Sequence, residues 1–178
     1  MAFFCSSRRA TTPNCGACWK RDGRWYSWGG LITTENSMSV AEFRVAGWTR
    51  ALKEQGLPVD PKLIAPAKFA ADSAGGAAVQ LLDLEEPPTA MFVDNLMATT
   101  GVLGALREKG LSCPTDVEVL SSDDAPWLDM FQPPISTIVQ PSYEVGTRAA
   151  ELLLKRIAHP KRAHEVILLK PELRIRVS

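Results

Sequence analysis

The stretch PTAMFVDNLMA, at residues 88–98, shows the unit from which the fold is built. Its apolar run Thr89–Val93 predicts a buried strand, because a short continuous apolar segment behind a Pro-Pro turn is typical of one. A polar pair, Asp94-Asn95, follows the strand, and a helix is expected from about Leu96 to Lys109, where Gly110 ends it. A strand that leads through polar residues into a helix predicts one unit of an α/β sheet.

The same alternation of strand and helix continues on both sides of this stretch. Further helices are expected at about 39–55, from residue 72 or 73 onward, and at 141–158, and Pro126 suits the first turn of a short helix. Strands separated by helices predict an α/β fold, a parallel sheet with helices on both faces, in which ligands bind outside the carboxyl ends of the strands. The other strands are expected at residues 62–65, 117–120, 136–139, 166–169 and 173–177.

The composition excludes several classes of protein. The 178 residues are enough for one ordinary domain, and 46% hydrophobic and 22% charged residues are typical of a globular chain. Twenty basic residues balance twenty acidic ones, which argues against sequence-independent binding to nucleic acid phosphates. No run of about 18 apolar residues occurs, so we expect no membrane span.

Residues 1–30 differ in composition from the rest of the chain. They carry five basic residues against one acidic residue, and they hold three of the four cysteines and three of the five tryptophans. Arg8-Arg9 interrupts the apolar start at once, so we expect no secretory leader and therefore reduced cysteines. We expect a boundary near residue 30, with residues 1–30 as an atypical segment, disordered or out of frame, and 31–178 as the globular part.

The pair Cys15-Gly16-Ala17-Cys18 raises the possibility of a small zinc or redox protein. Zinc needs about four ligands, and only Cys5 is near in the sequence. A thioredoxin-like site needs a preceding strand and a following helix, and neither is evident. We therefore expect no metal and no cofactor, and with two histidines so near the end of the chain we expect no Ser/His/Asp arrangement and no enzyme activity.

Five stretches of the sequence, at residues 37–48, 88–98, 116–127, 133–141 and 143–154, carry a resemblance to a known family. They resemble, in this order, segments of the lactose-repressor (LacI/GalR) family of transcriptional regulators. Together they span about residues 31–178, and their agreement in register makes the resemblance specific. The resemblance implies the C-terminal lobe of a two-lobed effector-binding domain with a periplasmic-binding-protein-like (type I) fold.

The resemblance covers only the second half of such a regulator. We find no helix-turn-helix and no first lobe, so we expect a truncated or frame-shifted reading, or a chain with its own N-terminal extension. The helix at 141–158 is similar to one that packs on the first lobe. Without that lobe its apolar face would be uncovered, so we expect self-association or low stability, and weak effector binding. The face is formed by Val145, Ala149, Leu152, Leu153 and Ile157.

The resemblance implies ligand-binding roles for Arg44 and Asp123. Arg44 matches the arginine that reaches the effector in the family, and a guanidinium offers five fixed donors for hydroxyls or a carboxylate. The alternative for Arg44 is a solvated helix arginine. Asp123 matches the first aspartate of a ligand-binding pair, and its alternative is a helix cap before Pro126, for which Asp124 is the better candidate.

The resemblance also implies ligand-binding roles for three further residues. Asp94 falls where the family has asparagine, and Asn95 where it has aspartate, so the order is reversed here. Phe69 matches an aromatic position that stacks on an effector ring, and otherwise it packs within a loop. Gln140 matches the polar residue at the hinge between lobes.

The resemblance implies the effector-binding and dimerisation part of a LacI-type regulator. In most of the family the effector is a sugar, and in a minority a nucleobase. We expect a homodimer in the cytoplasm that reaches operator DNA only through the missing N-terminal domain, without contact to a membrane. The alternative is a periplasmic sugar-binding protein of a transport system, which the absent leader and the regulator-like residues 133–141 disfavour.

Overall fold

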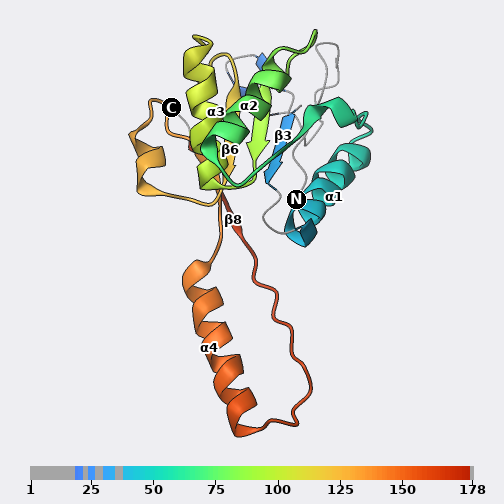
Figure 1. The fold of residues 1–178 in the computed structure, drawn as a ribbon, viewed down its shortest axis with the longest axis vertical. Helices are drawn as coiled ribbons and strands as arrows, with labels where there is room; N and C mark the ends of the chain where they lie inside the picture. Colours follow the sequence, from blue (N-terminus) through green and yellow to red (C-terminus); the bar gives the residue numbers. More distant parts are fainter. Residues whose placement is uncertain (1–18, 22–23, 27–29, 35–37, 177–178) are drawn as a thin grey trace.

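The computed structural model describes residues 19–21, 24–26, 30–34 and 38–176 (Figure 1). The Cys15/Cys18 pair and Cys5 lie outside the described residues. A short antiparallel hairpin, β1 (Trp19–Arg21) and β2 (Arg24–Tyr26), precedes the main sheet. None of the helices in the described part is long and apolar enough to cross a membrane.

The main sheet has six strands in the order β4-β3-β5-β6-β7-β8. The first five are parallel to one another, as the sequence predicts, whereas β8 runs antiparallel to β7 along the edge. The strands are β3 (Gly30–Thr34), β4 (Ile64–Ala67), β5 (Ala90–Val93), β6 (Glu118–Ser122), β7 (Ser136–Val139) and β8 (Glu172–Arg174).

Helices cover both faces of this sheet, which confirms the expected α/β architecture. Alternate residues of β5 enter different clusters, because neighbouring side chains of a strand point to opposite faces. Met91 and Val93 belong to the core shared with α2 (Ala71–Leu82) and α3 (Leu96–Glu108). Phe92 packs instead with Trp48 and Leu52 of α1 (Met38–Glu54) on the other face.

The ends of α1 and α3 follow from local sequence. Gly56 after α1 and Gly110 after α3 have φ angles of 68° and 67°, the left-handed conformation that glycine adopts at little cost. The amide of the residue after each glycine, Leu57 or Leu111, donates to a carbonyl of the last helical turn, at 2.9 Å in both. These helix ends are where the sequence predicted them.

Several expected strands differ from the structure, among them the one expected at 173–177, which lies at Glu172–Arg174. The strand expected at 62–65 begins at Ile64, because Pro61 opens a 3-10 turn (Pro61–Leu63). The side chain of Asp60 caps this turn by accepting a hydrogen bond from Lys62 N at 2.9 Å. The strand expected at 117–120 lies at Glu118–Ser122. The strand expected at 166–169 was wrong: these residues form no strand, and none of the strands in the described part of the chain pairs with them.

Helix α4 (Ser142–Ala158) and the returning segment 159–171 extend away from the sheet, as Figure 1 shows. No residue of α4 is buried. Its apolar face is open to solvent, with exposed fractions of 60% for Leu153 and 66% for Ile157. In the returning segment, Leu168 is 91% exposed.

Candidate functional site

The carboxyl ends of the parallel strands bring the predicted site residues to one edge of the sheet. Asp94 follows β5, Asp123 follows β6 and Gln140 follows β7, and these three strands are neighbours. Arg44 reaches this edge from α1, and Phe69 lies in the loop after β4. The site is therefore assembled by topology from four separate βα connections.

Arg44 and Asp94 form an ion pair. Arg44 Nη1 lies 3.6 Å from Asp94 Oδ2, the Asp94 side chain is fully buried, and that of Arg44 is 26% exposed. Asn95 Nδ2 donates to Asp94 Oδ1 at 2.7 Å, and Asn95 Oδ1 accepts from Ala98 N at 2.8 Å. Asn95 thus caps α3 and orients the carboxylate of Asp94 at the same time. Because the order is Asp-Asn, the asparagine is the residue that caps α3 and the aspartate is the one that pairs with Arg44.

Asp123 and Gln140 are also in contact. Asp123 has a φ of 75°, a left-handed conformation that aspartate adopts more readily than most residues, and this turns the chain sharply after β6. Its backbone amide donates to Ile138 O at 2.9 Å. Gln140 Nε2 donates a hydrogen bond to Asp123 Oδ1. The loops after β6 and β7 are therefore joined at the carboxyl edge.

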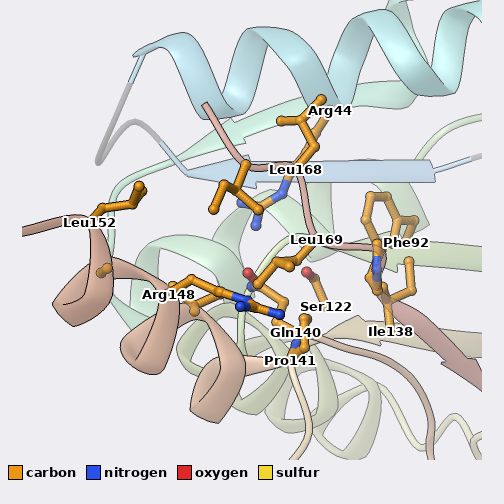
Figure 2. Close-up of a pocket in the computed structure, with 14 residues that line it drawn as sticks. Arg44, Phe92, Ser122, Ile138, Gln140, Pro141, Arg148, Leu152, Leu168 and Leu169 are labelled. Carbon is orange, nitrogen blue, oxygen red and sulfur yellow. The ribbon is translucent and has the colours of Figure 1, made fainter. Parts of the chain in front are cut away.

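A cavity of about 530 Å³ lies between this edge, α4 and the returning segment (Figure 2). Arg44 enters it from α1 and Arg148 from α4, on opposite sides, while Ser122 and Gln140 lie between them. Asp94 and Asp123 do not line the cavity themselves but contact Arg44 and Gln140, which do. Phe69 is 53% exposed and does not line it. The remaining lining is mainly apolar: Phe92, Ile138, Pro141, Val145, Ala149, Leu152, Ile167, Leu168, Leu169 and Pro171.

Sequence reasoning missed Arg148 and the returning segment as parts of the cavity wall. Arg148 follows Val145 by three residues, which places both on one side of α4, and that spacing could have indicated it. The guanidinium of Arg148 is held by two carboxylates of its own helix, with 3.7 Å from Nε to Glu144 Oε1 and 3.1 Å from Nη1 to Glu151 Oε2. Residues 167–169 carry no local signal for their position, because it depends on how the chain returns from α4.

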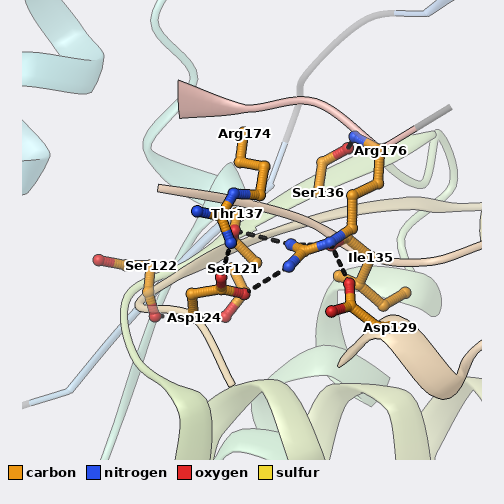
Figure 3. Close-up of polar contacts among 9 residues, drawn as sticks. All are labelled: Ser121, Ser122, Asp124, Asp129, Ile135, Ser136, Thr137, Arg174 and Arg176. Carbon is orange, nitrogen blue, oxygen red and sulfur yellow. Dashed lines mark hydrogen bonds and ion pairs between the residues drawn. The ribbon is translucent and has the colours of Figure 1, made fainter. Parts of the chain in front are cut away.

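Asp124, next to Asp123, contacts two arginines near the end of the chain (Figure 3). It does not cap the 3-10 helix Pro126–Met130, whose first position is preceded by Ala125 without a side-chain cap. Its Oδ2 lies 2.5 Å from Arg174 Nη1 and its Oδ1 lies 2.8 Å from Arg176 Nη2. Burial raises the pKa of Asp124, but the hydrogen bond and charge of Arg176 and the charge of Arg174 outweigh it and hold the pKa below its ordinary value.

Arg176 binds several further groups around β7 and β8. It donates to Ile135 O at 2.9 Å and to Thr137 Oγ1 at 2.8 Å, and its Nε lies 2.5 Å from Asp129 Oδ1. This cluster fixes β8 against β7, and β8 directly follows the segment that lines the cavity. The cluster therefore anchors one wall of the candidate site.

The cavity combines a few polar groups with an apolar wall, which is the usual composition of a small-molecule site. Within the part of the chain that the structure describes, no group of three or more His, Cys, Asp or Glu side chains could hold a metal ion. The arrangement offers hydrogen-bond donors from Arg44, Arg148 and Gln140 and a hydroxyl from Ser122. Such groups suit a ligand that carries hydroxyl or carbonyl oxygens.

Comparison with known proteins identifies the family of the chain. Residues 29–178 match the model of the periplasmic binding protein-like domain. The chain is 36% identical over 130 residues to the HTH-type transcriptional repressor PurR of Vibrio atlanticus (strain LGP32), covering 73% of this chain and 39% of that protein. It is 35% identical over 128 residues to the HTH-type transcriptional repressor CytR of Escherichia coli (strain K12), covering 72% and 38%. The chain thus spans about two fifths of the length of these relatives.

A solved structure resembles it as well. The LacI family transcriptional regulator from Enterococcus faecium, with bound ribose, superimposes with a TM-score of 0.74 at 28% sequence identity. The match covers 83% of this chain and 54% of that structure.

Proposed function

The chain belongs to the periplasmic binding protein-like family and matches the effector-binding domain of LacI-type transcriptional regulators, and on this premise we propose that its cavity binds a small-molecule effector, specifically a sugar. The observation that carries the proposal is the convergence of Arg44, Ser122, Gln140 and Arg148 on one cavity at the carboxyl edge of the sheet. Its volume of about 530 Å³ lies within the range of small-molecule sites. The ribose bound to the related regulator from Enterococcus faecium supports a sugar.

Each predicted site residue has a place in this proposal. Arg44 and Gln140 contact the effector directly from the cavity wall. Asp123 acts beside Gln140, and Asp94 acts through Arg44. Phe69 lies outside the cavity wall, in the loop after β4, and contacts a part of the effector that extends beyond it.

The effector would act by shifting a conformational equilibrium. A ligand that contacts both α4 and the sheet edge binds more tightly when these elements are close than when they are apart. The difference between the two binding free energies sets how far the ligand shifts the equilibrium. We propose that α4 belongs to the first lobe of the domain. The support is that none of its residues is buried while one face is apolar.

The rest of the regulator's activity is proposed from its relatives. They are named helix-turn-helix repressors, so we propose that the regulator binds operator DNA through a segment outside the matched region, as a homodimer in the cytoplasm. The same names favour a regulator over the sugar-binding component of a transporter and over an enzyme.

The test is a binding screen with neutral sugars and nucleosides, followed by NMR or calorimetry on the purified chain. Arg44→Gln should weaken binding by about tenfold or more, because a buried hydrogen bond from a charged donor is lost. Arg50→Gln is the matched control, since Arg50 lies on the same helix but pairs with Glu54 in solvent at 3.4 Å. The proposal of a sugar effector fails if no sugar of the panel binds, or if the two variants weaken binding equally.

A further inference from the structure

The carboxylate of Asp94 is buried directly behind a cation of the cavity wall. It is fully buried, and Arg44 stands between it and the cavity, with one guanidinium nitrogen 3.6 Å from the carboxylate. A buried carboxylate is stable only when cations and hydrogen-bond donors compensate its charge. Arg44 is therefore engaged on its inner side before any ligand arrives.

The orientation of this pair is fixed by the chain itself. The helix cap on α3 holds Asn95, with Asn95 Oδ1 2.8 Å from Ala98 N. Asn95 Nδ2 donates a hydrogen bond to Asp94 Oδ1 at 2.7 Å, and Asp94 Oδ2 is paired with Arg44. Because a guanidinium has five donors in a planar fork, contact through Nη1 leaves other donors of Arg44 for the cavity. Arg44 can thus donate hydrogen bonds to a ligand while its charge is balanced from behind.

The second arginine of the cavity is balanced in the same way. Among the described residues that line the cavity, Arg44 and Arg148 are the only charged ones. Arg148 is flanked by Glu144 and Glu151 on its own helix, at 3.7 and 3.1 Å. Both arginines of the cavity therefore have carboxylate partners. An incoming anion would be repelled by these carboxylates as well as attracted by the arginines.

Building on the proposed function, we propose that Asp94 is a specificity-determining residue: it neutralises Arg44, so that the cavity accepts an uncharged, hydroxyl-rich effector and rejects a phosphorylated or carboxylated form of it. An anion at Arg44 would be repelled by Asp94 and would compete for the cation that this buried carboxylate needs. A hydroxyl or carbonyl oxygen accepts from the free donors of Arg44 without disturbing the pair. Asparagine at this position would remove the negative charge and keep the shape.

Inorganic sulfate is the first probe, because it reports the charge of the cavity without knowledge of the effector. The readout is the NMR signal of the Arg44 Nε–H group during titration of the full chain. We expect no saturable change in the wild type at millimolar sulfate. Asp94→Asn should gain a sulfate site with at least about tenfold higher affinity, as expected when one nearby like charge is removed. The double variant Asp94→Asn/Arg44→Gln should lose that site again.

The matched control is Asp83→Asn, which removes an exposed carboxylate that pairs with Lys109 outside the cavity. It should leave the response to sulfate unchanged. If Asp94→Asn does not fold, as judged by circular dichroism, Asp94→Ser repeats the test with a smaller neutral side chain. The inference is overturned if the wild type binds sulfate at Arg44, or if neutral substitution of Asp94 brings no gain.

The second probe is a matched pair, ribose and ribose 5-phosphate. The wild type should prefer ribose, and Asp94→Asn should shift the preference toward the phosphate ester by about tenfold or more. An equal preference in wild type and variant would also overturn the inference. If neither sugar binds but Asp94→Asn gains sulfate, the sugar proposal fails while the role of Asp94 in the charge of the cavity stands.

Discussion

Arg176 and Asp124 are 52 residues apart in the sequence, yet Arg176 Nη2 lies 2.8 Å from Asp124 Oδ1. The contact joins the segment just after β8 to the loop after β6, and that loop also carries Asp123 of the candidate site. The Arg176 side chain is only 9% exposed and that of Asp124 16%. Because the pair is shielded from solvent, we expect it to contribute more than a surface ion pair does.

Asp124→Asn should lower the stability of the chain at neutral pH by about 1–3 kcal/mol, because Arg176 and Arg174 lose a charged acceptor. The pKa of Asp124 is lowered in the folded state, so its stabilising effect is present above the unfolded pKa of about 4 and is lost as the pH falls through the lower folded value. Urea unfolding between pH 7 and pH 2.5 should therefore show a flatter acid limb in the variant. An unchanged acid limb would show that the pair contributes no pH-dependent stability, and Asp83→Asn serves as the exposed control.

Gly101→Ala should destabilise the fold by about 3 kcal/mol, because a Cβ there would meet the backbone oxygen of Ala71 on α2 at 2.0 Å. Gly104→Ala, on the same helix, meets nothing within 4 Å and should stabilise by about 0.5–1 kcal/mol through higher helix propensity. Thermal unfolding of the two variants measures both effects. Equal changes in the two variants would contradict the close packing of α2 on α3.

Cys113 should resist alkylation in the native state. Burial raises the pKa of its thiol to about 12, so almost none of it is thiolate at pH 8. Treatment with iodoacetamide, followed by mass spectrometry of the peptide that contains Cys113, should show little modification under native conditions and full modification in 8 M urea, roughly the concentration that unfolds most domains. Rapid labelling of the native chain would mean that this region opens readily.

Leu153→Glu should reduce self-association of the chain by about tenfold, because it places a charge on the apolar face of α4 that the structure leaves open to solvent. Thr147→Glu adds the same charge to an exposed α4 residue outside the apolar face and should change association little. Sedimentation velocity over a range of concentrations distinguishes the two. A wild-type chain that is monomeric at every concentration would contradict the prediction.

Much of the fold could be predicted because its signals are local. The helices α1, α3 and α4 were expected within about one residue of their observed bounds, and strand β7 at its observed residues. Helical spacing of apolar residues and a glycine in the left-handed region depend on neighbours only a few positions away. The position of the candidate residues at the carboxyl edge also followed from the parallel arrangement of the strands.

The expected strand at 166–169 shows where local signals fail. Val166 to Leu169 are apolar and would suit a strand, but a strand forms only when another strand supplies its hydrogen-bond partners. Here the segment returns from α4 away from the sheet, and part of it lines the cavity. Likewise, Arg148 lines the cavity only because α4 lies across the cavity from the carboxyl edge of the sheet.

The sequence by itself determined the α/β architecture, the family and the edge of the sheet on which the candidate residues lie, because periodicity, turn residues and motif order are properties of the chain. Only the tertiary structure decided the partners: Arg44 with Asp94, Gln140 with Asp123, and Asp124 with Arg176 instead of a helix cap. The partners in these contacts are 17, 50 and 52 positions apart in the sequence, and no local pattern encodes them. Charge balance in the cavity is therefore a property of the folded chain.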